Sequence, residues 1–267
     1  VPEPDQRILA LVDGGANARD QIEARVAQIV AGMWVGFDGW YRGELVAEIS
    51  AQVAAMVGRG QVGIAQLTDA YLAQVATLVR ERPVGPVGVA SGMVASRRDG
   101  VALDEVYARV AGEYRWQVSR DVVPIDARRI AVERAKAMVS TDLGLAFRDQ
   151  TQAFMERTGA AGYRRVIRPE FSRSGTCGLC AAASNKVYKR RDLMPMHARC
   201  RCTVVEVGGQ VDVGRVINDA EYAAVAAESD SLRARDLVKV RVHVHGELGP
   251  VLTDAAHDFR GPRQVAA

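Results

Sequence analysis

The sequence predicts an α+β protein in which an N-terminal region of long helices, including a hairpin, is followed by a small α+β domain and a short β-containing tail. Apolar residues recur every three to five positions up to about Arg157, which is typical of amphipathic helices. From Tyr163 this spacing gives way to strand-like alternation among turn-forming and charged residues. Four valines then alternate with polar residues from Val238 to Val244, which indicates a strand in the tail.

The composition is that of a folded, water-soluble chain. Its 267 residues are 48% hydrophobic, 25% charged and 6% aromatic, which is enough to bury a core and excludes a small disulfide scaffold. The net charge of +3 is too small to indicate a nucleic acid or a membrane by itself. No apolar run reaches the roughly 18 residues of a membrane span, and the polar start, Val1 to Gln6, does not resemble a secretory signal. We therefore expect synthesis in the cytoplasm.

Residues 1–82 are predicted to form a helical hairpin. The apolar spacing indicates one long helix from Asp20, a candidate cap, to about Val57. After Gly58-Arg59-Gly60 the pattern resumes and predicts a second helix that ends before Pro83. Three glycines inside the first helix favour a kink or a close helix crossing: Gly32, Gly36 and Gly39.

Residues 83–100, which begin with a run rich in proline and glycine, are predicted to be a linker. Two more helices are predicted beyond it, from about Leu103 to Val118 and from Asp126 to Arg157, separated by Pro124 and closed by Gly159. The simplest interpretation of the helical region is a packed bundle without chemistry of its own. In such a bundle the three tryptophans are core or interface anchors rather than a ligand cage: Trp34, Trp40 and Trp116.

Two strands are predicted in the small domain, from Tyr163 to Arg168 and from Cys202 to Val207. We place this domain, with the two preceding helices, at residues 101–207 and the tail at residues 208–267. The tail is expected to hold a short helix over residues 219–228 and one strand with a buried valine face.

All four cysteines fall within one short window, which favours metal ligation over a secreted disulfide framework. Cys177 and Cys180 form a Cys-x-x-Cys turn, and His197, Cys200 and Cys202 follow sixteen residues later. Paired thiolates and an imidazole at such spacing suit a tetrahedral Zn²⁺ ion. Five candidates compete for four positions, so either Cys200 or Cys202 completes a closed site, which is structural rather than catalytic. Buried reduced cysteines and disulfides are the alternatives.

The order of these features carries a family resemblance. A long helix leads into the strand from Tyr163, then into Cys177-Gly-Leu-Cys180, a basic linker and Pro195-Met-His197-Ala-Arg-Cys200-Arg-Cys202. This order resembles the Mu F-like minor head (head morphogenesis) proteins of tailed bacteriophages, over about residues 126–207. The linker from Ala181 to Met194 departs from the family, which often has Leu-x-Gly there.

The resemblance implies a minor structural protein of the phage head, made in the host cytoplasm and incorporated into the virion. Its partners would be the portal, capsid or scaffold proteins and packaged DNA, with no membrane during assembly. Related actinobacteriophage proteins are labelled capsid maturation proteases. A non-enzymatic head protein is therefore the leading hypothesis, and a maturation protease that acts on scaffold or major capsid protein is the alternative.

A serine protease needs an imidazole base beside its nucleophile. His197 is better explained by metal, which makes His243 and His245, on the polar face of the predicted tail strand, the weak candidates. No spacing places either beside Ser172, Ser174 or Ser184, and neither Gly-x-Ser-x-Gly nor His-Glu-x-x-His occurs. A His-Cys nuclease is less favoured, because His197 cannot be both zinc ligand and general base.

Basic residues concentrate around the Cys/His motif. Between Ala160 and Thr203, ten Lys and Arg residues face two acidic ones, which leaves about +8. We expect this surface to contact DNA phosphates or an acidic protein partner, with equal weight on the two. The candidate contacts are Arg164, Arg165, Lys186, Lys189, Arg190, Arg191, Arg199 and Arg201.

Overall fold

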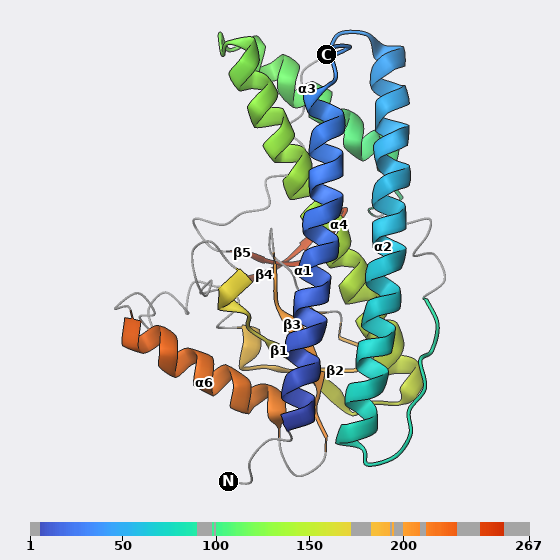
Figure 1. Ribbon diagram of the computed structural model, residues 1–267, viewed down its shortest axis with the longest axis vertical. Helices are drawn as coiled ribbons and strands as arrows, with labels where there is room; N and C mark the ends of the chain where they lie inside the picture. The colour runs from blue at the N-terminus through green and yellow to red at the C-terminus, as the bar shows by residue number, and fades with distance from the viewer. Residues whose placement is uncertain are drawn as a thin grey trace.

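The structure is a computed structural model that confirms the α+β class and the long N-terminal helices (Figure 1). It describes residues 6–89, 98, 100–171, 183–192, 194, 200–208, 212–228 and 241–253. The candidate ligands Cys177, Cys180 and His197, and the candidate contact Arg199, lie outside the described residues.

Four long helices form the body of the protein: α1 (Gln6–Val35), α2 (Gly43–Val79), α3 (Leu103–Val118) and α4 (Pro124–Thr158). Helices α1 and α2 run antiparallel along the long axis, and α4 crosses behind them (Figure 1). Both α3 and α4 pack on α2, and α4 also packs on α1. The predicted hairpin is therefore part of a larger helical bundle.

The turn of the hairpin is not where the sequence predicts it. Asp20 lies in the middle of α1 rather than at a cap, and α2 continues through Gly58 and Gly60 without a break. The chain reverses over residues 36–42 instead, where Arg42 N–H donates to the Gly39 carbonyl at 2.9 Å. Aromatic rings hold this turn: Trp34 and Trp40 stack at 5.6 Å, and Trp40 stacks on Tyr114 of α3 at 4.3 Å.

Gly60 stays helical because it occupies a close helix contact. A Cβ atom at this position would lie 3.0 Å from Val26 of α1 and 3.1 Å from Leu143 of α4. The missing side chain therefore lets three helices approach one another. The glycine that resembles a helix breaker in the sequence is a packing device.

The next two helices match their predicted bounds within a few residues. α3 spans the predicted range, and α4 begins at Pro124, whose missing N–H costs nothing at a first helical position. Gly159 closes α4 in the left-handed conformation, at φ 65°.

A three-stranded antiparallel sheet lies at the end of the hairpin opposite its turn (Figure 1). Strand β1 (Gly162–Val166) is central, between β2 (Val187–Lys189) and β3 (Thr203–Glu206). The register pairs Tyr163 with Tyr188 on one side and with Glu206 on the other. A short 3-10 turn, η2 (Pro169–Phe171), follows β1.

The sheet docks on the hairpin through β3. The Tyr71 hydroxyl of α2 donates to the Val204 carbonyl at 2.6 Å, and Arg80 pairs with Glu206 at 2.7 Å. Buried residues of all four helices and of β1 and β3 form one continuous hydrophobic cluster. The residues placed in separate sequence regions, 1–82 and 101–207, therefore share a core.

In the tail, α6 (Val213–Glu228) begins six residues before the predicted helix and packs on β1 and β3. Its first turn is capped by Asp212, whose carboxylate accepts the Arg215 N–H at 3.0 Å. This local capping bond explains the earlier start.

Strands β4 (Arg241–His245) and β5 (Gly249–Thr253) form a hairpin in which Val242 pairs with Leu252. The prediction of a buried valine face is wrong within β4, because Val242 is 61% and Val244 74% exposed. The buried residues of this hairpin are Leu248 in its turn and Val251 and Leu252 in β5. Val238 and Val240 lie outside the described residues.

Within the described chain, one helix, α2, has the length and apolar composition that a membrane span requires. Half of its most apolar stretch is buried inside the protein, and core helices share this composition.

Candidate functional site

Cys200 and Cys202 lie just before β3, where α1 packs on the sheet. Cys200 is 4% and Cys202 2% exposed, and together with Ile167 they form a separate buried cluster. Both lie in the three residues that precede β3. The choice of Cys200 or Cys202 as a metal ligand stays a prediction.

Helix α1 fixes the backbone of this segment through Arg19. Its guanidinium donates to the Cys202 carbonyl at 2.8 Å and to the Cys200 carbonyl at 3.1 Å, while it stacks over Phe147 at 4.2 Å. Burial lowers the pKa of Arg19, against the opposing charge of Glu23, but an arginine stays charged at neutral pH. A charged donor thus holds both carbonyls across the interface between α1 and the segment from Cys200 to Cys202.

Arg201 points to the same helix. Its Nη1 lies 2.6 Å from Glu23 and 3.1 Å from Asp20. Glu23 is buried, which raises its pKa, while Arg19 and Arg201 act in the opposite direction. These ion pairs join the motif to α1, so the charge of Arg201 is balanced inside the protein.

A second arginine lies against the thiols from the sheet. Arg165 of β1 is fully buried, and its Nη1 lies 3.6 Å from Cys200 Sγ. Asn218 of α6 fixes the strand there, because its amide donates to the Arg165 carbonyl and accepts the Ile167 N–H. A metal-bound thiolate accepts such outer bonds, which orient the ligand.

Two buried sulfur donors, one of them 3.6 Å from a guanidinium nitrogen, are compatible with a structural metal site. The other candidate ligands, Cys177, Cys180 and His197, lie outside the described residues. Among those the structure describes, no group of three or more His, Cys, Asp or Glu side chains is placed to hold a metal ion.

The candidate basic surface divides into buried and exposed members. Arg164 and Arg165 are buried in β1, and Arg164 pairs with Asp212 at 2.7 Å. With Arg201, they are used within the fold and do not form an exposed basic face. The exposed members follow one another along β2 and its turn: Lys186, Lys189, Arg190 and Arg191.

The two weak protease candidates lie on β4, in the hairpin that β4 forms with β5. His243 is exposed, and His245 Nδ1 accepts the Glu247 N–H at 3.1 Å. An acceptor at Nδ1 places the proton of the neutral ring on Nε2, which then cannot take a proton from a nucleophile. The candidate Ser184 is buried beside β2, whereas Ser172 and Ser174 lie outside the described residues.

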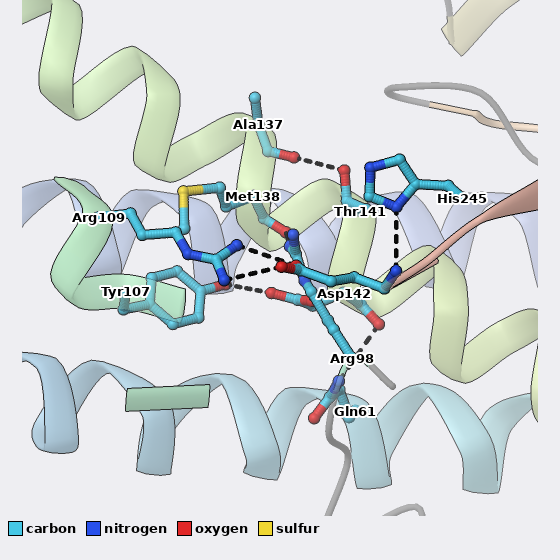
Figure 2. A network of polar contacts seen from close by, with 10 residues as sticks. Gln61, Arg98, Tyr107, Arg109, Ala137, Met138, Thr141, Asp142 and His245 are labelled. Carbon is cyan, nitrogen blue, oxygen red and sulfur yellow. Dashed lines mark hydrogen bonds and ion pairs between the residues drawn. The ribbon is translucent and has the colours of Figure 1, made fainter. Parts of the chain in front are cut away.

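The sequence reasoning missed a buried polar network near the middle of the bundle (Figure 2). Asp142 of α4 is 0% exposed and accepts bonds of 2.7 Å from Arg98 Nε and from the Tyr107 hydroxyl. Burial and the neighbouring Asp142 charge raise the pKa of Tyr107 well above its usual value, so it stays a donor. A carboxylate inside the most apolar stretch of its helix is the signal that could have found it.

No protein-family model, curated protein or solved structure matches the chain.

Proposed function

We propose that the chain is a minor structural protein of a bacteriophage head, in which a metal knuckle secures a small basic domain to a helical bundle. The observation that carries the proposal is the Cys-x-x-Cys and His-x-x-Cys-x-Cys order of the Mu F-like proteins, together with the burial of Cys200 and Cys202. Buried thiols next to a helix that grips their backbone suit a structural role, because a catalytic metal needs an open position.

Cys177, Cys180 and His197, with Cys200 or Cys202, would hold the ion. A bound Zn²⁺ supplies a cross-link between chain segments that are too short to bury a core of their own. The chain's own residues do the rest: Arg19 and Arg165 fix the geometry of the second ligand pair, and Arg201 ties it to α1.

The exposed cations on β2 and its turn are the proposed contact with DNA phosphates or with an acidic face of the portal. Lys189, Arg190 and Arg191 form no ion pair with any residue that the structure describes, and Lys186 lies over the Tyr188 ring at 5.2 Å. Unneutralised cations grouped on one edge favour a polyanionic partner.

The metal is tested on the purified full-length chain. We expect about one zinc ion per chain, loss of that zinc in His197→Ala but not in His243→Ala, and a lower unfolding midpoint after chelation. Metal in fewer than about half of the chains, together with stability that chelation leaves unchanged, contradicts the metal proposal.

The head assignment is tested by co-expression with the portal, scaffold and major capsid proteins encoded next to the gene. The chain should sediment with procapsids, and reversing the charge of Lys186, Lys189, Arg190 and Arg191 to glutamate should release it. The matched control reverses four exposed arginines of the helical region: Arg25, Arg42, Arg59 and Arg120. Equal release by both sets, or no sedimentation of the wild type, contradicts the proposal.

The same co-expression experiment separates a structural head protein from a maturation protease, and a protein partner from DNA. Cleavage of scaffold or capsid protein that disappears in His245→Ala favours the protease. Sedimentation with DNA-free procapsids assigns the cations to protein, whereas binding only to DNA fragments assigns them to phosphate.

A further inference from the structure

The turn between β4 and β5 is seated on α3 and α4 by a small set of contacts. Arg109 of α3 forks the Glu247 carboxylate, with N–O distances of 2.8 and 2.9 Å. Arg148 of α4, itself buried, donates to the Leu248 carbonyl at 2.7 Å. Two arginines thus bind neighbouring groups of the turn: Arg109 binds the Glu247 carboxylate, and Arg148 binds the Leu248 carbonyl.

An apolar contact completes the seat. Leu248 and Val251 are buried with Leu145 of α4 in a cluster of their own. The outward valines Val242 and Val244 are exposed, and the two strands pair with each other. The hairpin is therefore held by its turn and by the buried side of β5, whereas β4 presents its valines to solvent. Elements with this little buried surface are the ones that open locally.

The charges around the turn balance only while Glu247 is in place. Arg98 and Arg109 are opposed by Asp142 and Glu247, and Asp142 already accepts bonds from Arg98 and Tyr107 (Figure 2). When the turn leaves, the half-buried guanidinium of Arg109 loses its forked partner. A planar guanidinium in such a place selects another carboxylate.

We propose that Arg109, Arg148 and Leu145 form a binding site for a peptide turn that presents a glutamate carboxylate followed by a leucine. Glu247 and Leu248 occupy this seat in the isolated chain, and a partner segment of the same chemistry takes it when the hairpin leaves. The carboxylate binds the Arg109 fork, the next carbonyl binds Arg148, and the leucine side chain packs on Leu145. This site does not depend on the metal or on the head assignment.

The probe is a fluorescein-labelled peptide with the sequence of residues 241–253, added to full-length chains and followed by fluorescence anisotropy. The Glu247→Ala/Leu248→Ala chain weakens the internal occupant and should bind the peptide at least ~10-fold more tightly than the wild type, because an occupied site lowers apparent affinity by its vacant fraction. In the Glu247→Ala/Leu248→Ala chain, adding Arg109→Ala should weaken peptide binding by ~10-fold or more. Adding Arg120→Ala, which changes an exposed arginine beyond the end of α3, should leave the peptide affinity unchanged.

A peptide with glutamine in place of its glutamate should lose affinity to the same extent as Arg109→Ala, since both remove the charged fork. Circular dichroism and the urea midpoint verify that each chain folds, and Arg109→Lys, which keeps the charge but not the fork, provides a second variant with intermediate affinity. Equal peptide affinity of the wild-type and the Glu247→Ala/Leu248→Ala chains overturns the proposal. So does unchanged affinity in folded Arg109→Ala.

Discussion

Replacing Asp142 by asparagine removes a negative charge from the middle of the bundle while keeping the size of the side chain. Asp142 is fully buried and accepts two bonds of 2.7 Å, from Arg98 and from Tyr107. Hydrogen bonds to a charged group contribute about 1.5–3 kcal/mol each, and breaking a buried ion pair costs about 3–5 kcal/mol. Because the amide keeps one acceptor oxygen, we expect the free energy of unfolding to fall by about 3 kcal/mol.

Urea unfolding followed by circular dichroism measures this loss. With an m value of about 3 kcal/mol/M, the midpoint should fall by about 1 M. The matched control is Asp126→Asn on the same helix, whose ion pair with Arg129 is exposed and should contribute less than about 0.5 kcal/mol. The double variant Arg98→Met/Asp142→Leu removes both charges and should be more stable than Asp142→Asn. A loss below about 1 kcal/mol in Asp142→Asn, or a double variant less stable than it, refutes the reasoning.

Three further predictions follow from single contacts. Arg19→Met loses two bonds to the carbonyls of Cys200 and Cys202 and should lower the free energy of unfolding, measured in urea, by about 2–4 kcal/mol. Arg25→Met on the exposed side of α1 should change it little. Gly63→Ala, with open space around its Cβ position, should raise the free energy of unfolding by about 0.5–1 kcal/mol. Gly60→Ala should be less stable than Gly63→Ala, because the side chains of Val26 and Leu143 must move to make room for the new methyl group. The Arg109 fork lowers the pKa of Glu247 below its usual 4.5, helped by the charges of Arg98 and His245 and opposed by burial. The contribution of Glu247 to docking is therefore complete above pH 4.5 and is lost as pH falls through the lower docked-state pKa. The protection factors of the β5 amides, which compare each exchange rate with that of the unstructured chain at the same pH, should fall there in the wild type but not in Glu247→Gln.

Local signals set the bounds of α3 and α4, whereas tertiary contacts set the hairpin turn. Pro124 and Gly159 act within one turn of their own helix, so the sequence alone reveals them. Phe37 and Trp40 continue the helical spacing although they lie in the turn, where they pack on Trp34. Gly60 resembles a break until Val26 and Leu143 are placed beside it. Those neighbours are distant in sequence, so the spacing of apolar residues around Gly60 does not reveal them.

The Asp142 network and the Glu247 seat lay beyond sequence reasoning for the same reason. Arg98 reaches Asp142 from 44 positions away, and Arg109 reaches Glu247 from 138. An isolated acidic residue in an apolar helix signals a buried partner, but it does not say which of many arginines supplies it. The Cys/His motif can be proposed from sequence because its spacing is local.

The charge around the motif shows how far a count along the chain can mislead. The excess of about +8 between Ala160 and Thr203 counts only the acidic residues inside that window. The fold brings in others from outside it: Asp212 pairs with Arg164, Asp13 with Arg168, and Glu23 with Arg201. Arg165 is used against Cys200 in the interior. Four exposed cations on β2 and its turn are what the described part of the window leaves for a partner: Lys186, Lys189, Arg190 and Arg191.

The smaller number of exposed cations gives the proposed contact with DNA a numerical test. If the chain binds duplex DNA through these four cations, the logarithm of the binding constant should fall against the logarithm of salt concentration with a slope near ~−3.6, at about −0.9 for each phosphate. All ten basic residues of the window would give a slope near ~−9. Filter binding from about 50 to 200 mM salt separates the two values. A slope near the larger value contradicts the burial argument, because Arg164, Arg165 and Arg201 could contribute to it only if the sheet and its contact with α1 came apart.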